Sequence, residues 1–347
     1  MRVLRGDEII RLFEGREGEI LEVVRRAYEI KEQGDYNCPN CPFLRLPDNT
    51  RDRIIPKPAF VGGSIQAVGI KWIASFPDNT RKRMDRASAS LILNSPQTGH
   101  PEAIMEGSVI SACRTGASAA LAASVLRGAD LVASAGFLGC GPINFETLRF
   151  LLCARPEIEE LLLYDTNAAR TRLFREKCDD IAGGRRTTIV DSAAVLFQRS
   201  DVASVATNAI VPHLERLEAC RDGAVILHIS LRDFSPQVIL DVENVVDDVE
   251  QVCSNRTSLD LAAQQVGHRN FIRATLGAIL LGAKPRNGAR PVMFSPFGLG
   301  ILDIALAQLT LELAKENEAG MALDNFLPTP WVERSYASRT AVNPSYR

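Results

Sequence analysis

The residues best suited to chemistry form a glycine-rich turn between an apolar segment and a helical one. Gly139 ends the apolar run DLVASAGFLG, Gly141 follows two residues later, and Pro142 opens the helical pattern PINFETLRFLLCA. The first glycine allows a tight turn. The second lets the backbone approach a pyrophosphate at the helix N-terminus, where N–H groups and the helix dipole favour anions. We therefore predict that Gly139, Gly141, Pro142 and Ile143 bind the phosphates of a dinucleotide.

A carboxylate follows at the spacing that a dinucleotide site needs. The strand-like segment LLLYD ends on Asp165, 26 residues after Gly139. A carboxylate there accepts hydrogen bonds from ribose hydroxyls and repels a 2′-phosphate, so NAD is favoured over NADP, although Arg170 could soften that preference. Asn144 replaces the third glycine of the fingerprint, and we expect the helix to lie slightly farther from the strand as a result. A plain glycine turn and a surface acid are the alternative interpretations.

Strands and helices alternate along most of the chain. From about residue 108, an Ala-rich helix is followed by near-continuous apolar strands and intervening helices, and a helix at 299–318 closes the region. This pattern predicts an α/β fold with a Rossmann-type, doubly wound parallel sheet. Residues 1–105 show short helices over 7–33, a proline-rich loop over 36–60 and adjacent strands, which is typical of an α+β unit. A chain of 347 residues favours two domains.

Composition and charge exclude several classes of protein. The chain has 40 basic and 42 acidic residues, without the basic footprint of a nucleic-acid binder. Its N-terminus lacks the apolar core of a signal peptide, and no long apolar run predicts a membrane helix, so we expect a cytoplasmic protein. Cys38 and Cys41 form a single C-x-x-C without a second pair, so no metal site is predicted. The four histidines are dispersed, and His228, in an apolar strand, is interpreted as a core residue.

Several further segments together resemble the ornithine cyclodeaminase/μ-crystallin family. The segment Cys113–Ser118, which contains Arg114, lies 25 residues before Gly139 when counted from that arginine. Lys71 lies in GIKWIASFPDN, TGHPEAIMEG follows at 98–107, and Asp233 comes after the HIS strand. The segment FGLGILDIALA at 297–307 resembles the family's closing Gly-x-x-x-x-Asp motif. The resemblance spans roughly residues 40–320.

The resemblance implies an NAD-dependent enzyme and favours one branch of the family. KWIASFPDN and HISLRDFSP look most like the dehydrogenases that act on N-(2-amino-2-carboxyethyl)-L-glutamate in 2,3-diaminopropionate biosynthesis, which feeds siderophores or peptide antibiotics. It also implies a homodimer. Residues 1–115, joined by 319–347, would form the substrate-binding and dimerisation domain, and 116–318 the Rossmann domain.

The resemblance also implies roles for individual residues. Arg45, Lys71 and Arg114 would hold the carboxylates of an amino-acid-derived substrate, with Ser88 near it. Asp233 would act beside the reacting nitrogen, and Lys71 could share the acid–base work. The remaining expected cofactor contacts, besides the glycine loop and Asp165, are Arg114, Thr115, Thr207, Asn208 and Ser230. Arg45 and Asp233 also have alternative, structural interpretations. Arg45 would then be a solvated charge in a loop, and Asp233 would pair with Arg232.

Three other functions remain open at this point. An ornithine cyclodeaminase would convert ornithine to proline and ammonia with bound NAD that is recycled. A μ-crystallin-like protein would bind nicotinamide cofactor without catalysis. A reductive aminase would act on another 2-oxo acid.

Overall fold

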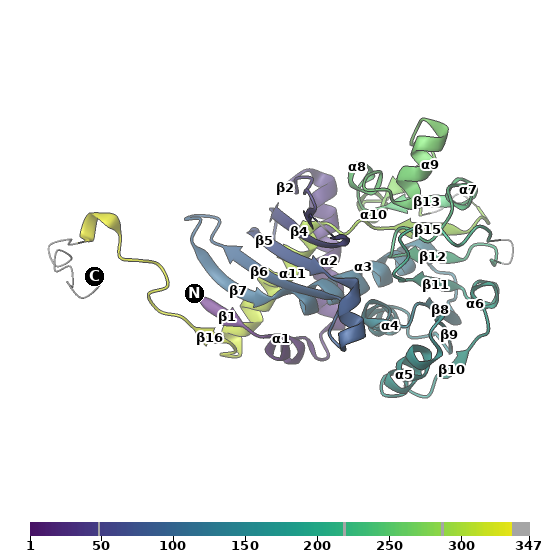
Figure 1. Ribbon diagram of the computed structural model, residues 1–347, viewed down its shortest axis with the longest axis horizontal. Coiled ribbons are helices and arrows are strands. Elements are labelled where there is room, and N and C mark those ends of the chain that lie inside the picture. The colour runs from purple at the N-terminus through teal and green to yellow at the C-terminus, as the bar shows by residue number, and fades with distance from the viewer. Residues whose placement is uncertain (48, 218–219, 286–287, 335–347) are drawn as a thin grey trace.

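The computed structural model describes residues 1–47, 49–217, 220–285 and 288–334, and it contains two sheets with helices packed between and around them (Figure 1). In the first sheet the strand order is β16-β1-β7-β6-β5-β4-β2, with β3 paired to β4. Its strands are β1 (Arg2–Leu4), β2 (Tyr36–Asn37), β3 (Leu44–Leu46), β4 (Asn49–Val61), β5 (Ala67–Ser75), β6 (Ala87–Asn94), β7 (Pro101–Glu106) and β16 (Met321–Ala322). Its central strands are antiparallel neighbours, as expected of an α+β unit.

The second sheet is parallel throughout the described chain, which confirms the predicted Rossmann-type fold. Its strands are β8 (Ser134–Leu138), β9 (Glu160–Tyr164), β10 (Arg186–Ile189), β11 (Val202–Val205), β12 (Val225–His228), β13 (Glu243–Val246), β14 (Ile272–Thr275) and β15 (Val292–Ser295). The strand order is β10-β9-β8-β11-β12-β15-β13-β14. The chain adds β9 and β10 on one side of β8 and the later strands on the other side, so the order of strand addition reverses at β8. Ligands of such sheets bind beyond the carboxyl ends of the strands, at the point of reversal.

Helices cover the sheets and fill the space between them (Figure 1). They are α1 (Gly6–Phe13), α2 (Glu17–Gln33), α3 (Gly107–Arg127), α4 (Pro142–Ala154), α5 (Ala168–Asp179), α6 (Ala193–Arg199), α7 (Pro236–Asp241), α8 (Val249–Val252), α9 (Ser258–Val266), α10 (Leu276–Leu280) and α11 (Gly300–Glu316), with 3₁₀ turns η1 (Pro77–Lys82) and η2 (Trp331–Glu333). Helices α2, α3 and α11 contact one another and pack on the first sheet. Helix α3 is apolar and long enough to span a membrane, but most of it is buried inside the fold, as in the core helix of a globular protein.

Small residues allow α3 to approach α4 closely. A Cβ atom on Gly116 would lie 2.6 Å from the carbonyl carbon of Glu146, a distance that real Cβ contacts do not show. Ala117, Ala120 and Ala123 of α3 are fully buried. The glycine and alanines in this segment therefore bring the two helices together, and they fix α3 between the two sheets.

The prolines at 56 and 58 lie in a long strand and not, as expected, in a loop. Strand β4 pairs with β5 from Arg53 to Val61. On its other edge, β3 pairs with β4 only up to Ile54 and β2 pairs from Phe60 onward. Pro56 and Pro58 thus occupy a stretch with a partner on one side only, where a missing N–H is tolerated.

The division of the chain differs from the predicted one in two places. The boundary near residue 115 falls inside α3, which contacts both sheets. Helix α11, which we expected to close the Rossmann domain, packs against β4 and β5 of the first sheet, where a Cβ on Gly300 would lie 3.2 Å from that of Ala59. The chain after α11 returns to the first sheet, because β16 pairs with β1 through Arg2 and Ala322. Residues 335–347 of the returning segment lie outside the described residues.

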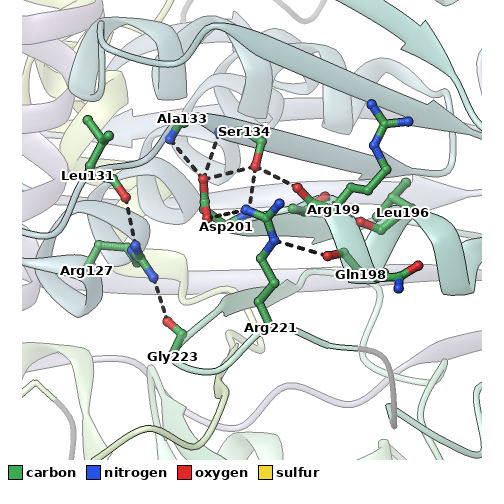
Figure 2. A network of polar contacts seen from close by, with 11 residues as sticks. Arg127, Leu131, Ala133, Ser134, Leu196, Gln198, Arg199, Asp201, Arg221 and Gly223 are labelled. Carbon is green, nitrogen blue, oxygen red and sulfur yellow. Dashed lines mark hydrogen bonds and ion pairs between the residues drawn. The ribbon is translucent and has the colours of Figure 1, made fainter.

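A polar network ties the amino ends of the second sheet together (Figure 2). The Asp201 carboxylate accepts hydrogen bonds from the N–H groups of Ala133 (2.9 Å) and Ser134 (3.0 Å). Arg221 donates to the other Asp201 oxygen (2.9 Å), and Arg127 donates to the carbonyl of Gly223 (2.8 Å). These contacts precede β8, β11 and β12, so this edge is structural and the opposite edge is left for ligands.

Candidate active site

A buried carboxylate joins two of the predicted site residues. Lys71 on β5 is 1% exposed, and its Nζ lies 2.7 Å from Oδ1 of Asp303 on α11. Arg114 on α3 donates from Nε to the same oxygen (2.9 Å). Ser111, one turn before Arg114, accepts from Lys71 Nζ (2.9 Å). The structure therefore brings Lys71 and Arg114 together, and it adds Asp303 and Ser111, to which the sequence prediction assigned no role.

The charges of this cluster do not balance. One Asp303 carboxylate is shared by two cations, and its Oδ2 has no hydrogen-bond partner among the described residues. Burial lowers the pKa of Lys71 to about 7, with Asp303 opposing that change and Arg114 adding to it. The pKa of Asp303 stays below its ordinary value, because the attraction of Arg114 and Lys71 outweighs its burial. Lys71 is therefore a group that can take up or release a proton near neutral pH.

A third cation connects this cluster to the second sheet. Lys57 on β4 lies directly opposite Lys71 in the sheet, and its Nζ donates to the carbonyl of Gly298 (2.5 Å). Asp247, at the end of β13, accepts from the N–H groups of Phe297 (2.9 Å) and Gly298 (2.7 Å). A Cβ on Gly298 would lie 2.9 Å from Nη1 of Arg114. The segment after β15 therefore places the lysine–arginine cluster against the carboxyl edge of the parallel sheet.

Asp233 lies at the same edge, inside a ring of donors. Its side chain is fully buried. Thr207, after β11, donates its hydroxyl to Oδ1, and Ser230, after β12, donates to Oδ2 (2.5 Å). Nε2 of His213 lies 3.2 Å from Oδ1, and the Asp233 N–H donates to Nε2 of the buried His228 (3.4 Å). The structure thus joins three predicted residues, Thr207, Ser230 and Asp233, with two histidines.

The donors keep Asp233 ionised. Burial by itself would raise the pKa of Asp233, but His228 and the hydroxyls of Ser230 and Thr207 hold it well below its usual range. The pKa of His228 is itself lowered by burial, against the attraction of Asp233. Asp233 is therefore a permanent anion at neutral pH, and it is better suited to holding a cation than to removing a proton.

The glycine loop has the geometry of a phosphate site. Gly139 follows β8 at φ 92°, and a Cβ there would lie 2.4 Å from the carbonyl oxygen of Ala206, so only glycine fits. Gly141 is the N-cap of α4, and as a glycine it has no side chain to cap the helix. It faces open space, since a Cβ there would meet nothing within 4 Å. Room is therefore left over the free N–H groups of the first turn, where an anion is stabilised.

Asn144 and Asp165 hold this loop in place. Asn144, in the position of the third glycine, is fully buried and donates to the carbonyls of Leu138 (2.9 Å) and Gly139 (2.7 Å). Its side chain thus bridges strand and helix. Asp165, at the end of β9, is half-buried and accepts from the N–H of Cys140 (2.8 Å). It lies beside the glycine loop, where a ribose would lie.

Two other predicted residues are placed differently. Thr115 lies in the interior of α3, which begins at Gly107, and not near a helix start. Its hydroxyl donates to the carbonyl of Ser111 (2.7 Å), and its N–H belongs to the helix, so it offers no free backbone donor to a phosphate. Ser88 on β6 lies three residues from Leu91, which pairs with Lys71, so the alternation of side chains puts Ser88 on the opposite face of the sheet.

The remaining predicted residues lie at the margins of the site. Arg45 on β3 is exposed, and its guanidinium carbon lies 5.6 Å from the centroid of the Phe43 ring. Asn208 is exposed in the loop after β11. Cys38 and Cys41 are free thiols that line a small hollow with Lys57. Among the described residues, no group of three or more His, Cys, Asp or Glu side chains could hold a metal ion.

Comparisons with known proteins agree with this geometry. The model of the ornithine cyclodeaminase/mu-crystallin family matches residues 16–318. The chain belongs to this family. It is 29% identical over 317 residues to N-((2S)-2-amino-2-carboxyethyl)-L-glutamate dehydrogenase of Staphylococcus aureus, a match covering 88% of this chain and 92% of the relative.

Two solved structures are similar over nearly the whole chain. Thermococcus litoralis Δ1-pyrroline-2-carboxylate reductase, solved with NADH and L-proline, has a TM-score of 0.86 at 27% identity, covering 93% of this chain and 100% of that one. An archaeal alanine dehydrogenase dimer with bound NAD has a TM-score of 0.83 at 25% identity, covering 94% and 99%. Such relatives are oxidoreductases of amino acids, and they support the same general activity here.

The sequence prediction missed several residues of the site, among them Asp303, Lys57 and His213. Asp303 lies in the quoted Gly-x-x-x-x-Asp segment, counted from Gly298, so its motif was visible although no role was assigned. Lys57 lies in the proline-rich stretch predicted as loop, and His213 lies in the connection between β11 and β12. Only the β4–β5 pairing and the contact with Asp233 reveal them.

Proposed function

We propose that this chain catalyses the NAD-dependent oxidative hydrolysis of N-(2-amino-2-carboxyethyl)-L-glutamate to 2-oxoglutarate and 2,3-diaminopropionate. The 29% identity to a dehydrogenase of that name supports the choice of substrate. The observation that carries the chemistry is the Lys71–Asp303–Arg114 cluster, in which a buried lysine with a pKa of about 7 lies beside an arginine.

The glycine loop and the carboxyl edge of the parallel sheet would hold the cofactor. Gly139, Gly141 and the first turn of α4 would bind its pyrophosphate, and Asp165 would accept from the adenosine ribose. The absence of a cation bonded to Asp165 among its described contacts favours NAD over NADP. When bound, NAD⁺ supplies the hydride acceptor, and the protein supplies orientation and charge.

Arg114 would bind the carboxylate next to the reacting carbon, with Arg45 as a second clamp. Neutral Lys71 would take a proton from the substrate nitrogen before the hydride leaves, and would release that proton to solvent. It would then take a proton from the water that attacks the imine and return it to the nitrogen, so that the amine can leave. Asp233 would hold the nitrogen in its cationic form. The C–N bond then breaks, leaving the carbonyl on the glutamyl carbon and the amine on the other product.

The chain would act as a homodimer through the outer face of the first sheet. Trp72 lies there, next to Lys71 in β5 but on the opposite face, and is 44% exposed. Ser88 lies on the same outer face. The similar archaeal alanine dehydrogenase is a dimer. Sedimentation of the purified chain would show twice the mass of 37.9 kDa, and a monomer would contradict this part of the proposal.

The direct test is incubation of the purified protein with N-(2-amino-2-carboxyethyl)-L-glutamate and NAD⁺. We expect equal amounts of NADH, measured at 340 nm, 2-oxoglutarate and 2,3-diaminopropionate. L-ornithine and L-alanine serve as comparison substrates. Proline and ammonia from ornithine without net NADH would instead identify a cyclodeaminase. Cofactor binding without turnover of any substrate would identify a binding protein.

A further inference from the structure

Arginine side chains gather at one end of the first sheet, beyond Lys57. Arg53 on β4 lies directly opposite Ser75 of β5. Arg86, just before β6, donates from Nη1 to the Ser75 hydroxyl (2.7 Å). The guanidinium carbon of Arg53 also lies 5.7 Å from the centroid of the Phe43 ring, which Arg45 approaches as well. Ser75 and Phe43 therefore bring these guanidinium groups into one corner.

This corner opens on the same face of the sheet as the lysine cluster. Arg53 and Lys57 are separated by an even number of positions in β4, and Lys57 pairs with Lys71. The side chains of all three therefore point to one face. At a rise of about 3.3 Å per residue, the Cα atoms of Arg53 and Lys57 are roughly 13 Å apart along the strand. An extended ligand that is held at each end by a long side chain of the protein can bridge this spacing.

An arginine beyond the second sheet adds positive charge toward this corner. Arg232 precedes Asp233, and its Nη2 donates to the carbonyl of Asn255 (2.8 Å). Burial, together with the nearby charges of Arg232, Arg86 and Arg45, lowers the pKa of Arg53 to about 10. Burial and the charge of Arg45 likewise lower the pKa of Arg232, and the neighbouring Asp233 opposes this change. Cations from both sheets are thus close enough to repel one another.

Carboxylates of the described chain do not neutralise these three arginines. The described residues contain no salt bridge from Arg53, Arg86 or Arg232 to an acid within 4.0 Å. Nε of Arg53 is buried and has no hydrogen-bond partner among the residues that the structure describes. Asp52 alternates to the other face of β4 and accepts from Asn49 (2.6 Å), while Asp233 is occupied by its hydroxyl donors. The corner therefore has unmet capacity for an anion.

We propose that Arg53 and Arg86 bind a second carboxylate of the substrate, remote from the one that Arg114 binds, with Arg232 of the second half of the molecule adding positive charge. Guanidinium groups match a carboxylate with paired donors, and an anion removes the repulsion among them. The inference rests on the proposed function, because it takes the lysine cluster as the site of the first carboxylate. It assigns the enzyme to amino-acid-derived substrates with at least two carboxylates on separate arms, and it disfavours small monocarboxylates such as alanine.

The first test measures binding and needs no turnover. 2-Oxoglutarate and 2-oxopentanoate, which lacks only the distal carboxylate, are titrated calorimetrically into the protein with NAD⁺. We expect 2-oxoglutarate to bind about tenfold or more tightly, since a charge-assisted hydrogen bond is worth at least that. Arg53→Gln should remove most of the difference and leave 2-oxopentanoate unaffected. The matched control is Arg175→Gln on the exposed face of α5.

The second test separates binding from stability. With N-(2-amino-2-carboxyethyl)-L-glutamate, Arg53→Gln and Arg86→Gln should raise KM about tenfold or more and change kcat less than about threefold. Without ligand, Arg53→Gln should melt at or above the wild-type temperature, because a like charge is removed. A purely structural arginine would lower the melting temperature.

The outcomes of the two tests distinguish the two proposals. A change in KM without a change in 2-oxoglutarate binding would place the second carboxylate on the diaminopropionate arm. Equal binding of both keto acids together with an unchanged KM would overturn the arginine site. If the substrate is not turned over but Arg53→Gln still removes the preference for 2-oxoglutarate, the arginine site stands and the proposed reaction fails.

Discussion

Lys71 shows how burial and neighbouring charge set the chemistry of one side chain. A lysine in water is protonated at neutral pH, but removal from water disfavours its charged form. Asp303 compensates only partly, because Arg114 shares the same oxygen. The result is a pKa of about 7, within reach of physiological pH.

The first prediction is a pH profile that follows Lys71. If neutral Lys71 is the base, kcat/KM should rise as pH increases through about 7, where the lysine loses its proton. Asp303 raises the pKa of Lys71, so Asp303→Asn should move the inflection to lower pH. Lys71→Arg, which stays charged, should lose the inflection together with most activity. An unmoved inflection in Asp303→Asn would assign it to another group.

The second prediction concerns Asp233. Asp233→Asn keeps the size of the side chain but removes the anion, and it should lower kcat by about 100-fold or more. Steady-state kinetics would measure the loss. Asp179→Asn, at the exposed end of α5, is the control and should behave as wild type. Full activity of Asp233→Asn would remove Asp233 from the mechanism.

At the scale of elements, the β8–α4 junction positions the cofactor site. Gly139 provides the left-handed turn, Gly141 leaves the helix N-terminus open, and Asn144 hydrogen-bonds the end of the strand. Asn144 also accepts from Ser204 (2.7 Å), which ties β11 to the same junction. A residue that departs from the usual fingerprint therefore stabilises the loop by hydrogen bonding.

The third prediction follows from these bonds. Asn144→Ala would remove the donor to the Gly139 carbonyl and the acceptor of the Ser204 hydroxyl, at a cost of about 1–3 kcal/mol for each group left unsatisfied, while the Leu138 carbonyl keeps the Ala206 N–H. We expect the urea concentration at the midpoint of unfolding to fall, and the affinity for NAD⁺ to decrease with it. Gln264→Ala on the exposed surface of α9 is the control. A variant with unchanged stability would show that the junction is held by other contacts.

Over the whole molecule, the two halves of the site are built on different sheets. The first sheet and α11 supply Lys71, Arg53 and Asp303, whereas the second sheet supplies the glycine loop and Asp233. Contacts such as Lys57 with Gly298 join them. Substrate binding and cofactor binding are therefore separable by mutation, although turnover needs both.

The fourth prediction tests this separation. Lys71→Met removes the base from the first sheet, so kcat should fall by at least about 100-fold, while the dissociation constant of NADH stays within about threefold. Fluorescence titration of NADH measures the second quantity. Lys82→Met, in the exposed turn η1, is the control for loss of a lysine. Loss of NADH binding in Lys71→Met would mean that the two halves depend on each other.

Local patterns in the sequence were sufficient for the parallel half of the molecule. Apolar strands alternating with helices predict the Rossmann sheet because each buried strand must be covered by helices, and the glycines at 139 and 141 mark the loop by their backbone freedom. The family motifs pointed to Lys71, Arg114 and Asp233, and the family membership they implied is confirmed.

Tertiary structure alone decided the partners of those residues. Asp303 reaches Arg114 across 189 positions of sequence, and only the packing of α11 on the first sheet makes this pair possible. Ser88 faces away from Lys71 because of strand register, which no local pattern specifies. Arg53 and Arg232 meet only when the two sheets assemble. Burial then lowers the pKa of Lys71 and leaves the arginine corner without a neutralising carboxylate. Both effects depend on distances in space, which the sequence does not specify.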